Sequence, residues 1–537
     1  MLTWIISQAT FLSRRVQSQF GLKSRQRLRQ QVIQKESGIH LSFVRACFIV
    51  CIGLLVFGVN PESARSQSTE VKISIISVSP PRVRIEGKRG DATCVWSFRN
   101  AYAGLLGLGD RIVNLTLEDA AGTIVPVRKL ASGEYEASRE AISWQCEVIL
   151  DPPAVAADAS HVSWIEGERG FLMLGDLLPR PAKEKSLPGT VARVRLDLPA
   201  AWNAYSNESQ RSEGQFDVMD ADNVVFFIGR GLRERRERVV GMDFTVITEG
   251  TWAFSDGDAT ALAASILKEY LSRTGIGAGP RVTLMLSHFP KTVGSERWSA
   301  ETRGRTVTLL SGQSPSKVAG LAQLSTPLTH ELFHLWVPNG LNLAGNYDWF
   351  YEGFTLYQAL CVSVRLGLLT FQDYLNALGR AYDSYSRSDD VRKLSLIEAS
   401  LRRWTGPTTL VYQKGMLVAF LYDLSLRHLT HGKHTLDDIY RTLFRNSKIA
   451  GSKQDGNQVL LAILNENDKM NGFVQSYIEK ADEIDLKTML VPFGLKFERA
   501  GQRSQISVAA KLDSRQRELL RAFGYNAEAK RAARRVS

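Results

Sequence analysis

The pentapeptide His330-Glu331-Leu332-Phe333-His334 places two histidines four residues apart, with a glutamate between them. On an α-helix, positions i and i+4 lie one above the other, so both imidazoles can bind one ion. Glu331 is rotated by about 100° from His330, which leaves it near the ion without making it a ligand. Neutral nitrogens that hold a cation, beside a carboxylate that acts as general base, are what a zinc hydrolase requires. The alternative is a chance match, which should occur in well under about 1% of such chains.

The residues around this motif predict the helix that must carry it. Thr326 can cap the helix and Pro327 suits its first position, while Pro338 with Gly340 closes it. The opposite side of the helix is apolar and predicts a buried back face, formed by Leu328, Leu332, Leu335 and Trp336.

Glu352 is the candidate for a third metal ligand, 18 positions after His334. It lies near the start of a second predicted helix, which is capped near Asp348 and ends before Gly367. A carboxylate that completes a His₂Glu set leaves the fourth coordination position open for water, as in catalytic zinc sites. Taken alone, Glu352 would be interpreted as a surface carboxylate, but beside the histidine pair we expect it to bind the metal.

Three segments, HELFHLW, WFYEGFTLY and YQKGMLVAFLYDLSLR, together resemble the gluzincin metallopeptidases. They are similar to the glycyl aminopeptidase family and, more distantly, to the aminopeptidase N family. The resemblance implies a thermolysin-like catalytic domain with a small mixed sheet and a mainly helical part. It further implies that His330, His334 and Glu352 bind Zn²⁺ and that Glu331 activates the zinc-bound water.

The third of these segments adds a second catalytic candidate, Tyr412. The resemblance implies that its hydroxyl donates a hydrogen bond to the oxyanion of the tetrahedral intermediate, a usual form of electrostatic stabilisation. Without the resemblance, Tyr412 would be interpreted as an ordinary helix aromatic. Lys414 and Gly415 belong to the same signature, and we expect packing roles for both.

The sequence departs from the glycyl aminopeptidases in three respects. The spacing between the histidine motif and Glu352 is shorter than usual there and nearer that of aminopeptidase N. The residues after about Val491 are too few for the PDZ domain with which those enzymes end, so we expect none. The Gly-Gly-x-Glu-His segment that holds a substrate's free amino group is not found. Trp298–Thr302 stands in its place, with Glu301 as a substrate-binding candidate or, alternatively, a surface glutamate.

The elements before and around the motifs predict an α+β fold. From Glu70 to about Thr245, short alternating runs broken by Gly, Pro and Asp predict a β-sandwich-like domain. Beyond Thr326, long helical patterns dominate. The predicted organisation has four parts. A leader with a signal peptide or membrane anchor (1–66) precedes an N-terminal β-rich domain (67–245). A gluzincin catalytic domain (246–490) follows, and a short C-terminal segment with a basic tail (491–537) ends the chain.

An uncharged apolar run of 14 residues, 46–59, follows a basic leader. It is shorter than the roughly 20 residues of a membrane span and predicts a signal peptide cleaved near Ser66. We therefore expect an exported, periplasmic protein, or one tethered to the membrane through residues 43–59 if cleavage fails. Cys94 and Cys146 would then meet oxidising conditions, and the sequence leaves open whether they pair.

The net charge of +12 lies mainly in the two ends of the chain. Residues 1–45 hold eight basic and one acidic side chain and residues 526–537 hold four and one, which leaves +2 for the rest. Nucleic-acid binding needs a basic face on the folded body, so we expect a peptide or protein substrate and no nucleic acid.

The predicted function is a zinc-dependent, aminopeptidase-like peptidase; the alternative is an inactive peptide-binding or scaffold protein on the same fold.

Overall fold

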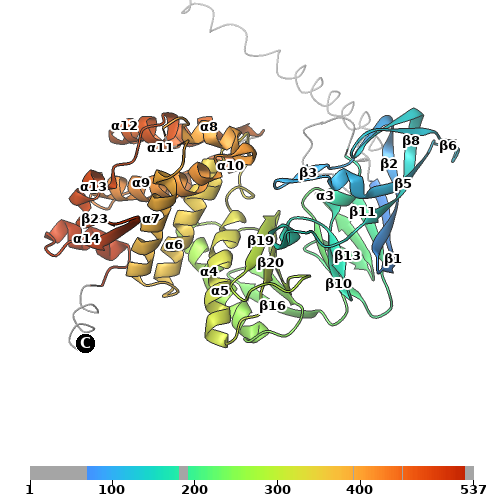
Figure 1. Ribbon diagram of the computed structural model, residues 1–537, viewed down its shortest axis with the longest axis horizontal. Coiled ribbons are helices and arrows are strands. Elements are labelled where there is room, and N and C mark those ends of the chain that lie inside the picture. The colour runs from blue at the N-terminus through green and yellow to red at the C-terminus, as the bar shows by residue number, and fades with distance from the viewer. Residues whose placement is uncertain (1–68, 181–191, 391, 450–451, 527–537) are drawn as a thin grey trace, which may run out of the picture. The chain divides into compact units, whose positions relative to one another are not determined.

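The computed structural model describes residues 69–180, 192–390, 392–449 and 452–526, so the predicted leader and cleavage site lie outside the described residues. Residues 67–537 form one compact unit. Three β-sheets and a helical part follow one another in this unit (Figure 1). In the described part of the chain, no helix is both long and apolar enough to span a bilayer.

The first layer is a nine-stranded sheet in the order β13-β14-β11-β1-β2-β8-β5-β6, with β7 paired to β8. In β11, Ala192, Val194 and Leu196 are buried while the arginines between them are exposed, as the predicted alternation requires. Cys94 and Cys146 are both free thiols in this sheet. The strands are β1 (Thr69–Val78), β2 (Pro81–Ser97), β5 (Ile112–Glu118), β6 (Ile124–Val125), β7 (Val127–Ala131), β8 (Glu134–Ile149), β11 (Ala192–Asp197), β13 (Ser209–Ser212) and β14 (Gln215–Val218).

The second layer is a four-stranded sheet that is buried on both faces. Its order is β12 (Asn203–Tyr205), β15 (Val225–Gly229), β10 (Arg169–Met173) and β9 (Trp164–Glu166). Leu172 and Phe226 pack toward the nine-stranded sheet, whereas Phe171 and Phe227 pack toward the third sheet. Burial on both faces explains the continuous apolar run of β15, and the paired sheets confirm the predicted β-sandwich.

The third layer is a five-stranded mixed sheet that carries the predicted catalytic region. Its order is β16 (Arg233–Val239), β17 (Met242–Thr248), β18 (Arg281–His288), β20 (Thr306–Ser311) and β19 (Trp298–Arg303). The strands β17, β18 and β20 run parallel, and β19 pairs antiparallel with β20 at the edge of the sheet. The domain boundary expected between residues 245 and 246 falls within β17. The sequence could not locate it better, because the alternation of a strand is the same whichever sheet the strand joins.

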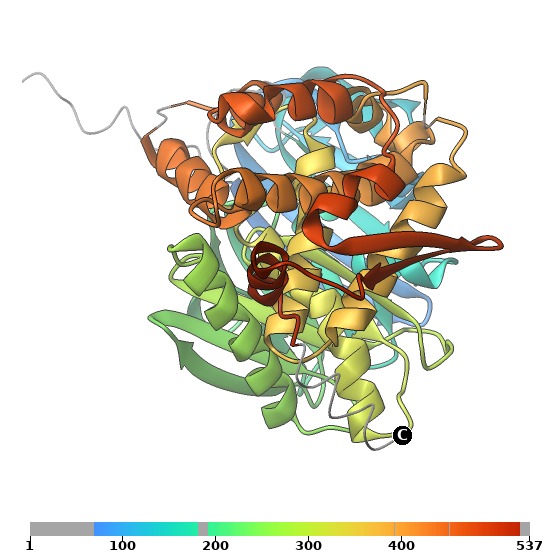
Figure 2. The ribbon, with the colours of Figure 1, turned by 90° about the vertical axis from the view of Figure 1, so that its left-hand side faces the viewer.

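The helical part, which faces the viewer in Figure 2, packs on the third sheet through α4 and α5. It contains most of the largest apolar core. Its α-helices are α4 (Asp256–Thr274), α5 (Lys317–His334), α6 (Thr355–Arg365), α7 (Phe371–Ser386), α8 (Leu396–Leu401), α9 (Gly415–Leu429), α10 (Leu436–Ile449), α11 (Gly456–Leu464), α12 (Asn471–Val474), α13 (Leu486–Met489) and α14 (Ser514–Ala522). Two π-helical turns, η3 (Trp349–Phe354) and η5 (Leu410–Lys414), precede α6 and α9. The hairpin β23 (Leu495–Ala500) and β24 (Arg503–Val508) packs on α7.

The helix that carries the histidine motif begins earlier than predicted. Ser316 is the N-cap of α5 and accepts a hydrogen bond from the backbone N–H of Ala319 at 3.3 Å. The predicted start at Thr326 and Pro327 is therefore wrong, since Pro327 lies inside the helix. A proline there removes one intrahelical hydrogen bond, but burial of Leu324 and Leu328 holds the two halves in one helix.

A short hairpin follows β2 and was not predicted. It consists of β3 (Ala101–Tyr102) and β4 (Leu105–Leu106), visible near the centre of Figure 1. The turn residues Ala103 and Gly104 have φ of 49° and 86°. Positive φ at both central residues is the geometry that lets a two-residue turn match the twist of its strands.

Candidate metal centre

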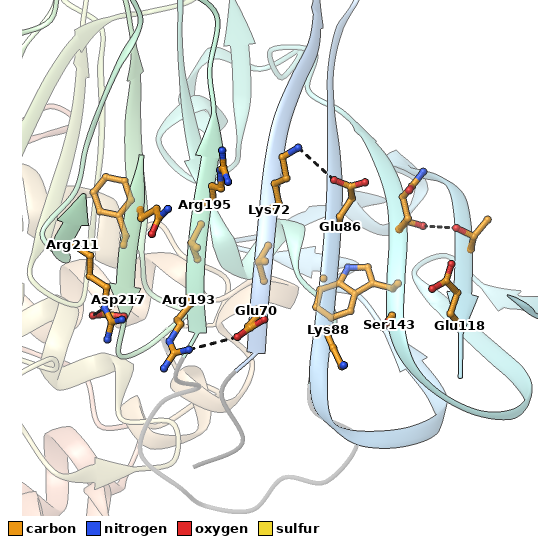
Figure 3. Close-up of a pocket in the computed structure, with 18 residues that line it drawn as sticks. Glu70, Lys72, Glu86, Lys88, Glu118, Ser143, Arg193, Arg195, Arg211 and Asp217 are labelled. Atoms are coloured by element: carbon orange, nitrogen blue, oxygen red, sulfur yellow. Dashed lines mark hydrogen bonds and ion pairs between the residues drawn. The ribbon is translucent and has the colours of Figure 1, made fainter. Parts of the chain in front are cut away.

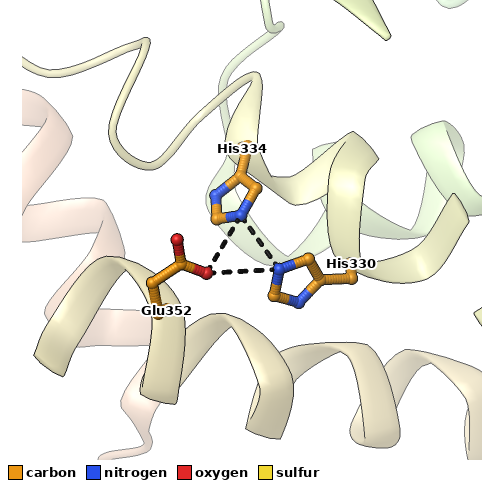
Figure 4. A group of neighbouring side chains, drawn as sticks. All are labelled: His330, His334 and Glu352. Carbon is orange, nitrogen blue, oxygen red and sulfur yellow. Dashed lines mark hydrogen bonds and ion pairs between the residues drawn. The ribbon is translucent and has the colours of Figure 1, made fainter. Parts of the chain in front are cut away.

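Three predicted ligands converge between α5 and η3, as Figure 4 shows. The Nε2 atoms of His330 and His334 lie 3.0 Å apart. The Glu352 Oε2 atom lies 3.3 Å from the first nitrogen and 3.5 Å from the second. A tetrahedral zinc ion with ligands at about 2.0–2.1 Å would place its ligand atoms about 3.3 Å apart. The donor set of two nitrogens and one carboxylate, with these separations, therefore fits zinc.

The charge balance of this group also favours a bound cation. Burial alone would raise the pKa of Glu352, but hydrogen bonds from His330 and His334 hold it well below its ordinary value. Burial alone would lower the pKa of His334, but the hydrogen bond and charge of Glu352 raise it to about 9. The buried, ionised carboxylate of Glu352 thus needs a positive charge beside it. A protonated histidine supplies that charge here, and a divalent cation can supply it in place of the proton.

The ring of His334 is oriented by the turn that follows α5. Its Nδ1 lies 2.8 Å from the backbone oxygen of Val337. Donation of the Nδ1 proton to that carbonyl leaves Nε2 with its lone pair toward Glu352 and His330. Hydrogen bonding of the second ring nitrogen is the usual way in which proteins fix the tautomer of a metal-binding histidine.

Arg403 is a functional candidate that the sequence interpretation missed. Its guanidinium binds the second oxygen of Glu352, Oε1, at 2.9 Å and the carboxylate of Asp348, also at 2.9 Å. Glu352 is therefore held by one oxygen while the other faces the histidines. Arg403 lies in the short 3-10 turn η4 (Arg403–Thr405), without helical or strand periodicity. No signal in the sequence connects Arg403 to the carboxylate of Glu352, which lies far from it along the chain.

Tyr412 lies on η5, beside the same arginine. Its hydroxyl oxygen accepts a hydrogen bond from Arg403 at 2.5 Å. Burial, followed by the negative charge of Glu352, raises the pKa of Tyr412 well above its ordinary value, so the phenol keeps its proton. Since the oxygen accepts from Arg403, the hydroxyl can still donate its proton, and a hydrogen bond with Glu352 is a further cause of the raised pKa.

The two π-helical turns approach each other through glycines. A β-carbon on Gly353 would lie 2.5 Å from the α-carbon of Gly415 and 2.7 Å from the Val411 carbonyl oxygen. Neither Gly353 nor Gly415 has room for a side chain larger than a hydrogen atom. Their close approach sets the spacing between Glu352 and Tyr412. Gly415 therefore has the packing role expected for it. Lys414 is buried, its Nζ has no hydrogen-bond partner within the described ranges, and burial lowers its pKa to about 8.

Glu331 is oriented by the edge strand of the third sheet. Thr302 on β19 donates its hydroxyl proton toward Oε2 of Glu331 at 2.8 Å and lies equally close to the backbone oxygen of the same residue. The charge of the Glu331 carboxylate also raises the pKa of His334 and of Tyr412, in both cases less than Glu352 does. It is thus close to both groups, where a general base would be needed.

Glu301 lies one residue before Thr302 and belongs to an ionic cluster. It accepts a hydrogen bond from the hydroxyl of Tyr102 and lies 3.2 Å from His161 Nδ1 and 3.1 Å from Arg303 Nε. Burial alone would raise the pKa of Glu301, but Arg303 and His161 lower it to about 2. The structure therefore places Glu301 on β19, next to Thr302, with its carboxylate already balanced by protein groups.

A separate groove of about 560 Å³ lies on the nine-stranded sheet (Figure 3). Some of its charged residues form ion pairs with one another, as in Lys72 with Glu86 at 3.8 Å and Arg193 with Glu70 at 3.5 Å. Pairing across neighbouring strands is how an exposed sheet face stabilises itself. None of the three metal-binding candidates lines this groove.

Comparison with known proteins agrees with this geometry. The sequence pattern of the M61 glycyl aminopeptidase family matches residues 323–418. This segment contains the histidine motif, Glu352, Arg403 and Tyr412. The predicted resemblance to the gluzincin metallopeptidases is thereby confirmed for the catalytic region, and Zn²⁺ is supported as the cofactor. No curated protein matches the chain.

The solved structures that are similar to this chain include the following two. An aminopeptidase N family protein from Idiomarina loihiensis has a TM-score of 0.68 and 18% identity, with 80% of this chain and 79% of that chain covered. The M1 zinc metallopeptidase from Deinococcus radiodurans has a TM-score of 0.49 and 12% identity, with 78% and 95% covered. The first of these similarities confirms the predicted α+β fold class, in which an N-terminal sheet-rich region is followed by a mainly helical part.

Proposed function

We propose that this zinc metallopeptidase hydrolyses peptide bonds near the amino end of its substrates, with Glu331 as general base and Tyr412 as oxyanion donor. The observation that carries the proposal is the convergence of two imidazoles and one carboxylate within 3.5 Å of one another. Such a group beside an oriented glutamate is the arrangement of metal-assisted hydrolysis.

His330, His334 and Glu352 would hold the zinc ion. When bound, zinc supplies Lewis-acid chemistry, which polarises the scissile carbonyl and makes water easier to deprotonate. Glu331 accepts the proton of the attacking water, and the same carboxyl group can then deliver it to the leaving amine. Thr302 holds Oε2 of Glu331 in place, so the base needs little reorganisation before the transfer.

Tyr412 and Arg403 act on the opposite side of the reacting carbonyl. The Tyr412 phenol is protonated and donates to the oxygen on which negative charge develops. Arg403 binds the Tyr412 oxygen and the Glu352 carboxylate together, which fixes the distance between the oxyanion donor and the metal ligand. The inactive scaffold alternative is not favoured, because the match to the M61 glycyl aminopeptidase family and the His-His-Glu group both support a zinc peptidase.

The substitution Glu331→Gln tests the proposal. The amide keeps the shape of the side chain but cannot accept a proton, so kcat/KM should fall about 10²- to 10⁴-fold. Zinc content, measured by mass spectrometry of the purified protein, should stay at one equivalent. The matched control is Glu296→Gln, an exposed glutamate with 74% of its side chain accessible. Unchanged turnover in Glu331→Gln would refute the assignment of the base.

We further propose export across a membrane on the basis of the apolar run 46–59, which lies outside the described residues. Cell fractionation and amino-terminal sequencing of the mature protein test this location. A new amino terminus near residue 66 in the periplasmic fraction supports cleavage, and an intact leader in the membrane fraction supports a tether. An intact leader in the cytoplasmic fraction contradicts export.

A further inference from the structure

A cavity lies in the helical part, where side chains of α4, α6, α7, α9, α10 and the end of α14 meet; several of these helices are labelled in Figure 1. Its volume is about 210 Å³. Since a water molecule occupies about 30 Å³ of the liquid, the cavity has room for a small polyatomic ion. The Arg365 side chain lines it and is 53% accessible, so the cavity opens to solvent there. None of the three metal-binding candidates lines this space, which we call the α14 cavity.

The two carboxylates that line the α14 cavity already have partners in the protein. Asp437 Oδ1 accepts from Arg273, at 2.9 Å from Nη2 and 3.1 Å from Nε. Asp423 accepts from Arg427 Nε at 3.0 Å, from a backbone N–H at 2.9 Å and from the Tyr357 hydroxyl at 2.8 Å. Protein donors therefore satisfy most of the acceptor capacity of Asp423.

Donors in the same cavity remain without acceptors. The hydrogen bond to Asp423 engages Arg427 through Nε, and in the described ranges neither terminal nitrogen of Arg427 donates to another residue. The buried Tyr374 hydroxyl has no partner in hydrogen-bonding geometry in the described part of the chain. Tyr357 interacts with it but gives its own proton to Asp423. Burial raises the pKa of Tyr374 well above its ordinary value, so this phenol stays protonated and can donate.

The guanidinium of Arg427 is held in place on two sides. Asp423 binds its Nε, and its carbon lies 4.8 Å from the centre of the Phe523 ring. A fixed, planar guanidinium with free terminal nitrogens matches a carboxylate or phosphate group, which accepts two parallel hydrogen bonds.

The charge of the lining also suits an anion. Three arginines and two aspartates line the α14 cavity. The third arginine, Arg365, pairs through Nε with Glu269 at 2.8 Å, and Glu269 is not part of the lining. Burial raises the pKa of the Cys361 thiol to about 11, so this lining residue is neutral. An entering anion thus meets a positive side chain at the opening and no unpaired carboxylate of Asp423 within.

We propose that the α14 cavity binds a small oxyanion, a carboxylate or a phosphate. The terminal nitrogens of Arg427 and the hydroxyl of Tyr374 are its donors, and Arg365 stands at the entrance. The bound anion connects α7, which carries Tyr374, with α9, which carries Arg427, and Phe523 at the end of α14 packs on the same guanidinium. Binding therefore stabilises the attachment of the C-terminal segment to the helical part. This inference does not depend on the peptidase function proposed above.

Isothermal titration calorimetry of the zinc-loaded protein tests the proposal. Sodium acetate and inorganic phosphate are titrated separately into a sodium chloride buffer of constant ionic strength. We expect saturable binding of one anion per chain, and the titrant that binds identifies the ligand as a carboxylate or a phosphate. The substitution Arg427→Gln removes the paired terminal nitrogens and keeps an amide that can donate to Asp423. It should raise Kd about 10- to 100-fold, because hydrogen bonds to charged groups are the stronger ones.

A second variant, Tyr374→Phe, separates binding from folding. It leaves Asp423 fully paired and removes a hydroxyl that has no hydrogen-bonding partner to lose. Its melting temperature in chloride alone should therefore equal or exceed that of the wild type, while Kd for the anion rises about 2- to 10-fold. A structural role for the hydroxyl would instead lower the melting temperature and leave Kd unchanged.

The matched control is Arg441→Gln on α10. Arg441 pairs with Asp438 at 2.9 Å and does not line the cavity, so this variant should bind the anion as the wild type does. If neither anion binds the wild type, the cavity holds only water and the proposal is overturned. Binding that both Arg427→Gln and Tyr374→Phe leave unchanged takes place elsewhere, such as at the metal centre, and overturns the proposal as well.

Discussion

Arg403 sets the electrostatics of the metal centre at the level of single residues. It neutralises two buried carboxylates, Glu352 and Asp348, and it binds the oxygen of Tyr412. A positive charge beside a zinc-ligating carboxylate would weaken zinc binding by repulsion, but it also keeps the ligand ionised and oriented. Orientation dominates where the ligand is buried, since partners of this kind are typically worth 10–100-fold in metal affinity.

The substitution Arg403→Met is therefore expected to lower zinc affinity by about 10- to 100-fold. It should also lower kcat at saturating zinc, because the Tyr412 hydroxyl loses its fixed position. Competition with a chromogenic chelator measures the first effect, and steady-state kinetics with excess zinc measures the second. The control Arg402→Met removes the neighbouring, exposed arginine and should change neither quantity. Equal zinc affinity in both variants would show that Glu352 needs no such partner.

The residues that could be predicted are those whose partners are close in sequence. The pair His330 and His334 lies on one helical turn, so periodicity alone brings the two rings together. Glu352 follows 18 residues later, at the start of the next helical segment. Thr302 and Arg403 reach the site from a sheet edge and an irregular turn, through contacts that span 29 and 51 residues. No local pattern records such contacts. The role of Tyr412 came from family resemblance, because an aromatic residue on a helix has no specific signal.

At the level of elements, the crossing of η3 and η5 determines whether Glu352 and Tyr412 share a site. The substitution Gly353→Ala would place a methyl group 2.5 Å from the backbone of Gly415, so the two helices must move apart. Overpacking of this kind costs about 1–3 kcal/mol of unfolding free energy. We expect the single substitution Gly353→Ala to lower the melting temperature, weaken zinc binding and reduce kcat.

The matched control for this crossing is Gly472→Ala, because a β-carbon there meets no atom within 4 Å. It lies in the helix α12, where alanine is favoured over glycine by about 1 kcal/mol, so its stability should be unchanged or higher. A Gly353→Ala protein with wild-type zinc affinity and turnover would show that the glycine contact does not set the site. Calorimetry and zinc titration of both variants decide the question.

Elements were predicted well where one periodicity held along a segment. Alternation in the N-terminal region predicted the β-sandwich. It could not assign β16 and β17 to the catalytic sheet, because the sequence of a strand does not identify its partner strands. The start of α5 was misplaced because Pro327 resembles a first helical residue. Burial of the helix on both sides of Pro327 outweighed that local preference. The β3–β4 hairpin is too short for periodicity to reveal.

At the level of the whole molecule, a shared core joins the N-terminal sandwich to the catalytic sheet. Phe171 and Phe227 stack at 4.3 Å between ring centres and pack with Met285 and Leu310 of the third sheet. Polar contacts reinforce this core, including Ser160 with Ser299 at 2.6 Å and Arg303 with the backbone oxygen of His161, also at 2.6 Å. The catalytic edge strand β19 is thus supported from the sandwich side.

We therefore expect the sandwich and the catalytic region to unfold together. The substitution Phe227→Ala removes a fully buried ring from the shared core and should cost about 3–5 kcal/mol. Differential scanning calorimetry should show one transition that moves to lower temperature, and thermal loss of peptidase activity should move with it. The control Ile124→Ala alters an exposed side chain on β6 and should leave the transition in place. Separate domains would instead give two transitions, with activity lost only at the transition that Phe227→Ala leaves unchanged. A single transition that shifts together with the loss of activity means that the sandwich and the catalytic region form one cooperative unit.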